Sequence, residues 1–82
     1  MQTVSDRDTR IVEIICDQLE IEPSELGETD RFVEDHGADS LAMIGVLAAL
    51  EKEFRISVEQ SDVDGMVDLR SVRDVVVKTA GW

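Results

Sequence analysis

The sequence predicts a small all-α bundle of four helices, three longer and one short, with a long first loop. Apolar residues recur at three- and four-residue spacing in three segments of the 82-residue chain, which is the pattern of amphipathic helices. Val75–Val77 would also suit a buried strand, but no second strand candidate exists to pair with it. A chain of this length predicts one domain, residues 1–82, that buries roughly 60–65% of its unfolded surface.

The first helix is predicted over residues 4–19, where four apolar residues share one face: Val4, Ile11, Ile15 and Leu19. Pro23 and Gly27 mark a long connection after it, with a turn of helix expected near Ser24–Leu26. A connection of this length is unusual in a compact domain. We therefore expect Leu26 and Phe32–Val33 to anchor it on the core.

The second helix is predicted from Ser40 to about Arg55, with Asp39 as the N-cap. Its core stripe has five members: Met43, Val46, Leu47, Leu50 and Phe54. A second apolar stripe, formed by Leu41, Ile44 and Ala48, lies roughly opposite. Either flanking segments cover this second stripe or it is an exposed patch for a partner. Its position beside Ser40 favours the partner.

The last third of the chain predicts a short helical turn and a final helix. The turn is expected between Ser57 and Gly65. Asp68 or Ser71 then caps the final helix, whose apolar face has four members: Leu69, Val72, Val75 and Val76.

Composition restricts the function of the chain. A formal net charge of −11 and a pI near 4.2 argue against nucleic acid and anionic membranes as partners and favour basic protein surfaces. A hydrophobic fraction of 43% is too high for a disordered acidic tail. The single cysteine, Cys16, excludes an internal disulfide and is expected to be buried. The sequence carries no signal segment or transmembrane run, so we expect a cytoplasmic monomer.

Catalytic and metal sites are not predicted. A calcium loop around Gly65 would place Gln60 and Ser71 at its first and last ligand positions, where the pattern requires acids. His36, Asp39 and Ser40 are the residue types of a hydrolytic triad, but neighbouring residues at a helix start do not give its geometry. Cys16 and His36 are too few for a zinc site. We expect His36 to be a solvated loop residue.

Ser40 is the candidate functional residue. It is predicted at the first position of its helix, where backbone amides and the peptide dipoles favour a bonded negative group by roughly 0.3–1 kcal/mol. Spacing alone favours a serine that only helps Asp39 to cap the helix.

The segment around Ser40 resembles an acyl carrier protein. The resemblance is carried by His36-Gly37-Ala38-Asp39-Ser40-Leu41, with Phe-Val-Glu-Asp before it and Leu-Glu-Lys-Glu-Phe after it, and it extends over nearly the whole chain. It implies that Ser40 carries a 4'-phosphopantetheine arm, that Asp39 is the helix cap beside it, and that the domain itself is not an enzyme. A phosphopantetheinyl transferase would attach the arm from coenzyme A. Ketosynthases, acyltransferases and other acyl-processing enzymes with basic docking patches would be the further partners.

Two departures from the family pattern indicate the pathway. Fatty-acid carriers commonly have acidic residues two and five positions after the modified serine, where this chain has Ala42 and Gly45. The order Asp-Ser-Leu-Ala, followed by a large apolar residue, resembles discrete polyketide carriers. We therefore expect a polyketide carrier that docks through four residues: Leu41, Ile44, Ala48 and Glu51. The alternatives are a fatty-acid carrier, a peptidyl or aryl carrier, and a small acidic adaptor without a prosthetic group.

Overall fold

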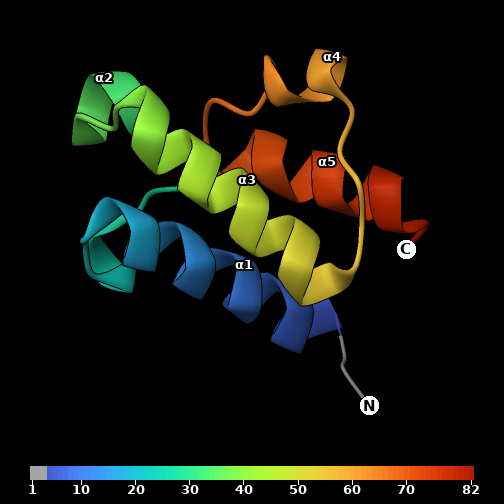
Figure 1. Cartoon of the computed structure of the whole chain (residues 1–82). Coiled ribbons are helices and arrows are strands. Elements are labelled where there is room, and N and C mark those ends of the chain that lie inside the picture. Colours follow the sequence, from blue (N-terminus) through green and yellow to red (C-terminus); the bar gives the residue numbers. More distant parts are fainter. Residues whose placement is uncertain (1–3) are drawn as a thin grey trace.

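The computed structural model describes residues 4–82, and their side chains from residue 6 onward, as helices joined by loops (Figure 1). The helices are, in chain order, α1 (Val4–Leu19), the 3-10 turn η1 (Pro23–Glu25), α2 (Phe32–His36), α3 (Ser40–Phe54), α4 (Gln60–Val63) and α5 (Leu69–Ala80). No strand occurs among these residues, which confirms the all-α prediction. None of these helices is long and apolar enough to cross a bilayer.

The core lies where α1 packs against α3 and α5. Each of the three helices contributes side chains that are fully buried: Ile11 and Ile15 from α1, Val46 and Leu50 from α3, and Val72 and Val76 from α5. Met43, Leu47 and Phe54 complete the predicted stripe of α3 at the edge of this core. Cys16 is buried and free, as predicted, whereas the predicted stripe member Val4 lies outside the described side chains.

The N-terminus of α5 is closed by a capping box. Asp68 accepts a hydrogen bond from the Ser71 N–H at 2.8 Å, and the Ser71 hydroxyl accepts one from the Asp68 N–H at 3.0 Å. Both predicted cap residues therefore act, in a reciprocal pair that satisfies two otherwise unpaired backbone donors.

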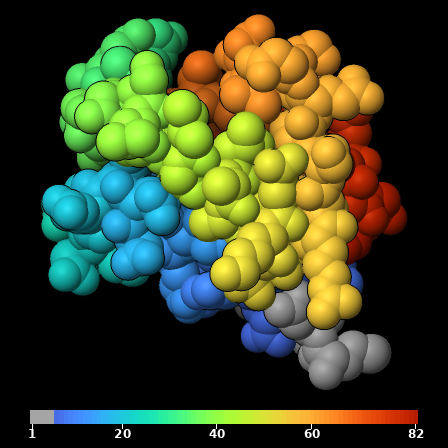
Figure 2. Space-filling model, viewed as in Figure 1, coloured from blue at the N-terminus to red at the C-terminus, as the bar shows by residue number. Residues whose placement is uncertain are grey.

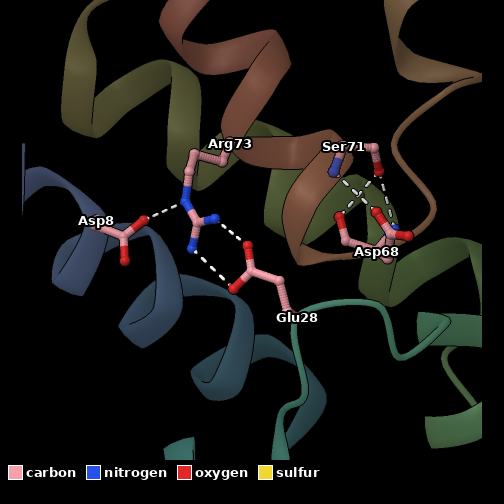
Figure 3. A network of polar contacts seen from close by, with 5 residues as sticks. All are labelled: Asp8, Glu28, Asp68, Ser71 and Arg73. Atoms are coloured by element: carbon pink, nitrogen blue, oxygen red, sulfur yellow. Dashed lines mark hydrogen bonds and ion pairs between the residues drawn. The ribbon is translucent and has the colours of Figure 1, made fainter.

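The first loop is held against the start of α5. The Phe32 N–H donates to the Val67 carbonyl at 3.0 Å, and the Arg70 N–H donates to the Glu28 carbonyl at 3.2 Å. The Arg73 guanidinium bonds both Glu28 and Asp8 of α1 (Figure 3). One α5 side chain thus joins the loop to α1.

The second half of this loop is a short helix, α2, which the periodicity did not predict. Leu26 and Phe32 are buried and anchor the loop as expected. Val33 is 61% exposed, so the prediction that it also anchors the loop is wrong. The reason is geometric, because consecutive residues on a helix point about 100° apart and only Phe32 faces the core.

Candidate functional site around Ser40

Ser40 is the first residue of α3 and is exposed. Asp39 before it has extended backbone angles, and its carboxylate accepts the Ala42 N–H at 2.8 Å, so its predicted N-cap role is confirmed. Within the described residues the Ser40 hydroxyl makes no hydrogen bond. The cap is therefore formed by Asp39 alone, and the Ser40 oxygen is left available at the positive end of the helix.

The residues between α2 and α3 explain why Ser40 reaches the surface. Gly37 ends α2 in the left-handed conformation, with φ of 66°, which a glycine adopts without a steric penalty. Ala38 is buried, and its N–H donates to the Phe32 carbonyl at 2.9 Å. This anchored turn fixes the point at which the chain leaves the core, so Asp39 and Ser40 follow directly on the outside.

His36 does not lie free in solvent, so the prediction of a solvated loop residue is wrong. It is the last residue of α2, its side chain is 12% exposed, and its Nε2 lies 3.1 Å from the Asp30 carboxylate. Asp30 also accepts the Gly27 N–H at 2.9 Å, and this bond first, and His36 second, lowers the pKa of Asp30. His36 and Asp39 are thus bonded to groups other than the Ser40 hydroxyl, and they do not form a triad with it.

An exposed apolar surface begins beside Ser40. Leu41 is 76% exposed, Ile44 is 62% exposed, and Ala48 continues the same stripe along α3. No segment among residues 6–82 covers these side chains, so the second predicted stripe is a surface and not a second core contact. We call Leu41, Ile44 and Ala48 the α3 stripe. Val33 on α2 is a further exposed apolar side chain, and it lines the same hollow in the surface as Ser40.

Glu51, the fourth predicted docking residue, is half-buried and has a structural bond. Its carboxylate accepts the Val58 N–H at 2.9 Å and thereby holds the segment that follows α3. The sequence from Ser40 to Leu50 contains no charged residue. The exposed face of α3 next to Ser40 is therefore neutral, although the chain as a whole carries a net charge of −11.

A groove opens next to Ser40 between α3 and the α4 region, and Figure 2 shows the surface hollowed between the green and the orange residues. This Ser40 groove has a volume of about 360 Å³ and is lined by Ser40 and mainly by apolar side chains: Val33, Met43, Ile44, Leu47, Val63 and Met66. Val63 and Met66 come from a segment about 20 residues after Ser40 in the sequence. Helical periodicity on α3 alone could not have assigned them to the site.

A second cavity of about 370 Å³ adjoins the groove, and we call it the distal cavity. Val33, Met43 and Met66 line both spaces, so the two lie next to each other on either side of these side chains. The distal cavity extends over Phe32 to Arg31, Glu34 and Val67. In the described part of the chain, no group of three or more metal-ligating side chains is present at this or any other place.

Comparisons with known proteins identify the family. Residues 9–76 match the family model described as "Phosphopantetheine attachment site". "Polyketide-8 synthase acyl carrier protein 1" from Streptomyces avermitilis is 45% identical over 74 residues, covering 90% of this chain and 88% of that protein. "Acyl carrier protein" from Wolinella succinogenes is 38% identical over 66 residues, covering 80% of this chain and 83% of that protein.

A solved structure shares the arrangement of the helices. A chain in the structure described as "The ishigamide ketosynthase/chain length factor" superposes with a TM-score of 0.77 at 34% identity, covering 94% of this chain and 97% of that chain. The family model spans most of the sequence, and both relatives are named as acyl carrier proteins and match over most of their own length. The chain thus belongs to the acyl carrier protein family, whose covalently bound prosthetic group is 4'-phosphopantetheine.

Proposed function

We propose that Ser40 is the attachment point of the phosphopantetheine arm and that the chain carries acyl intermediates of polyketide assembly as thioesters. The observation that carries the proposal is an exposed serine hydroxyl, free of hydrogen bonds within residues 6–82, at the first position of α3, which has no charged residue up to Leu50. An oxygen in this state can accept the phosphopantetheine group of coenzyme A in a reaction catalysed by a separate transferase.

The surroundings of Ser40 fit a phosphodiester. The first turn of α3 presents backbone N–H groups and the positive end of the peptide dipoles, which stabilise a phosphate by roughly 0.3–1 kcal/mol at an exposed site. Asp39 bonds the Ala42 N–H and so fixes the first turn on which the serine stands. The Ser40 groove begins at the same residue and offers apolar walls to a group tethered there.

The protein contributes binding and presentation, because the arm supplies the thiol that holds the acyl group. Tethering raises the concentration of that acyl group at any enzyme that docks the domain. The titratable residues that stand just before Ser40 in the motif are His36 and Asp39. Both are engaged in structural hydrogen bonds with other groups. We therefore propose a carrier without catalytic activity of its own.

The α3 stripe is the proposed docking surface for the partner enzymes. Leu41 and Ile44 are large apolar side chains more than half exposed, and such a contiguous patch on a small domain is typical of an interaction site. The partners we propose are a phosphopantetheinyl transferase, a ketosynthase and an acyltransferase. The related chain in a ketosynthase/chain length factor structure supports the second of them.

The polyketide pathway is favoured over fatty-acid synthesis by the residues that follow Ser40. Neither Ala42 nor Gly45 can present an acid to a partner. Ala42 is half-buried, with its N–H bonded to Asp39, and Gly45 lies against Gln18 of α1. The relative named as a polyketide synthase carrier also has the higher identity of the two compared, 45% against 38%.

Reconstitution with the partner enzyme tests the carrier function. The chain is loaded with an isotopically labelled acyl-phosphopantetheine group and mixed with a polyketide ketosynthase/chain length factor and extender units. We expect the label to pass into the elongated product with the loaded protein. The unmodified chain and Ser40→Ala should transfer no label. Transfer from the Ser40→Ala protein, or turnover by the unmodified chain, would contradict the proposal.

A further inference from the structure

The distal cavity combines apolar walls with one cationic side chain at its rim. Phe32, Met43 and Met66 provide apolar walls, and Arg31 stands at the edge. Ligand cavities in proteins are usually of this kind, with a few polar groups that fix the orientation of an otherwise apolar ligand. An arginine here is notable because the chain has only 8 basic residues against 19 acidic ones.

The main chain holds Arg31 in place. Its N–H donates to the Asp35 carboxylate at 2.8 Å, and its backbone pairs in an isolated antiparallel bridge with Asp68 at the start of α5. Among the described residues the guanidinium bonds only Glu34, at 2.8 Å, and both of these side chains are more than 60% exposed. An exposed ion pair contributes little to stability, so a ligand atom can replace Glu34 at little cost.

We propose that Arg31 is a specificity-determining residue, which selects an acyl chain that bears a carbonyl or hydroxyl oxygen where its far end meets the rim of the distal cavity. This inference rests on the attachment of the arm at Ser40 and adds the class of cargo and the residue that recognises it. Because the two cavities adjoin at Val33, Met43 and Met66, a chain tethered at Ser40 that passes these side chains comes to the cavity that Arg31 lines.

The surrounding charges favour a neutral oxygen over a carboxylate. Glu34, Asp35 and Asp68 all lie close to Arg31, and the whole chain is strongly acidic. A carboxylate at the end of the acyl chain would be repelled by these three acidic side chains. A ketone or hydroxyl oxygen accepts a hydrogen bond from the guanidinium without that repulsion, and the apolar walls accommodate the carbons before it.

The test compares chains of equal length on the same protein. The arm is loaded with an octanoyl group or with oxo-octanoyl isomers that carry the ketone at carbons five to seven, and intact mass verifies each loading. The rate at which added 2-mercaptoethanol cleaves the thioester by thiol exchange then reports how well the chain is held against the protein. We expect at least one oxo isomer to be cleaved about three- to ten-fold more slowly than octanoyl, the range of one typical hydrogen bond at a solvent-exposed site.

Arg31→Met should remove this difference, so that octanoyl and the oxo isomers loaded on this variant are cleaved at similar rates. Arg70→Met is the matched control, because Arg70 is an exposed arginine near Asp68 that does not line the distal cavity. On the Arg70→Met protein the oxo isomer should still be cleaved more slowly than octanoyl, as on the wild type. Equal cleavage of all chains on the wild type, or equal effects of the two variants, would overturn the inference while leaving the Ser40 proposal intact. Absence of any loading in the mass measurement would instead refute the Ser40 proposal and this inference with it.

Discussion

The side chain of Gln18 on α1 lies over Gly45 on α3, at a point where α3 has no side chain of its own. A Cβ at Gly45 would overlap the Gln18 Oε1 and lie 2.9 Å from its Cδ. Gly45 thus lets a neutral amide cover the position at which fatty-acid carriers commonly present an acid. The absence of a side chain at Gly45 therefore explains both the close approach of Gln18 to α3 and the lack of an acid at this position of α3.

Gly45→Ala is expected to stabilise the protein by about 0.5 kcal/mol. A glycine inside a helix costs roughly 0.5–1 kcal/mol relative to alanine, and the overlap falls on the flexible end of the exposed Gln18 side chain, which moves away at a small cost. Urea unfolding measures the change. In a Gln18→Ala background the gain should rise to about 1 kcal/mol. A loss of stability in both backgrounds would show that the backbones of α1 and α3 are too close for any Cβ.

Ile44→Glu is expected to weaken docking without unfolding the protein. Ile44 is 62% exposed, so the substitution removes no core contact, and surface changes of this kind stay within about 0.5 kcal/mol in stability. Loss of a central apolar contact should raise the KM for acyl transfer to the ketosynthase at least five-fold, or about 1 kcal/mol. Ile44→Ser should act in the same direction if the contact is apolar. A parallel fall in the melting temperature of both variants would place Ile44 in the core and remove the docking interpretation.

Leu50→Ala is expected to cost about 2–5 kcal/mol in the free energy of unfolding, because Leu50 is fully buried between the helices. Leu41→Ala is the matched control, since it makes the same substitution on the same helix at a residue that is 76% exposed. It should change stability by less than about 0.5 kcal/mol. Chemical denaturation of the two variants decides the matter, and similar losses would mean that the two stripes of α3 are assigned incorrectly.

Asp68 is expected to make stability depend on pH in the acid range. The Ser71 N–H first, and the Ser71 hydroxyl second, lowers the pKa of Asp68 below its usual value of 3.8. A carboxylate with a lowered folded-state pKa stabilises the protein above its unfolded pKa, and this contribution disappears as the pH falls through the folded-state value. At pH 7 Asp68→Ala should therefore cost about 1 kcal/mol, the usual effect of losing an N-cap.

The difference between the wild type and Asp68→Ala should begin to shrink when the pH falls below about 4, where the unfolded carboxyl takes up its proton. It should be lost once the pH has passed through the lowered folded-state pKa, because both proteins then lack the charged cap. Comparing the two proteins separates this effect from the general loss of repulsion as the other acids are protonated. Asp74→Ala, an exposed change on the same helix, is the control and should leave stability nearly unchanged at pH 7. A difference that stays constant down to pH 2 would contradict the charged cap.

The parts of the fold that depend on local sequence were predictable. The cap by Asp39, the buried face of α3 and the capping pair of α5 each follow from residues within one or a few turns of the helix concerned. Helical periodicity also predicted the α3 stripe, because Leu41 and Ile44 lie on the face of the helix opposite Val46 and Leu50. Periodicity left open whether another segment covers this stripe, and its position beside Ser40 favoured exposure.

The remaining features depend on contacts between distant segments, which a single sequence does not reveal. The five-residue helix α2 is fixed by the Phe32 bond to Val67 and by burial of the Phe32 ring. His36, the last residue of α2, is largely shielded from solvent and contacts Asp30, which precedes α2 in the sequence. The Ser40 groove is closed by Met66, which the sequence gives no reason to place beside Ser40.

The mass of the intact protein tests the central claim most directly. The wild type, Ser40→Ala and Ser61→Ala are each incubated with coenzyme A and a broad-specificity phosphopantetheinyl transferase, Ser61 being an exposed helical serine near the site. The wild type and Ser61→Ala should each gain the mass of one phosphopantetheine group, and Ser40→Ala should gain none. An arm on Ser40→Ala, or no added mass on the wild type with a transferase that modifies a known carrier, would contradict the assignment.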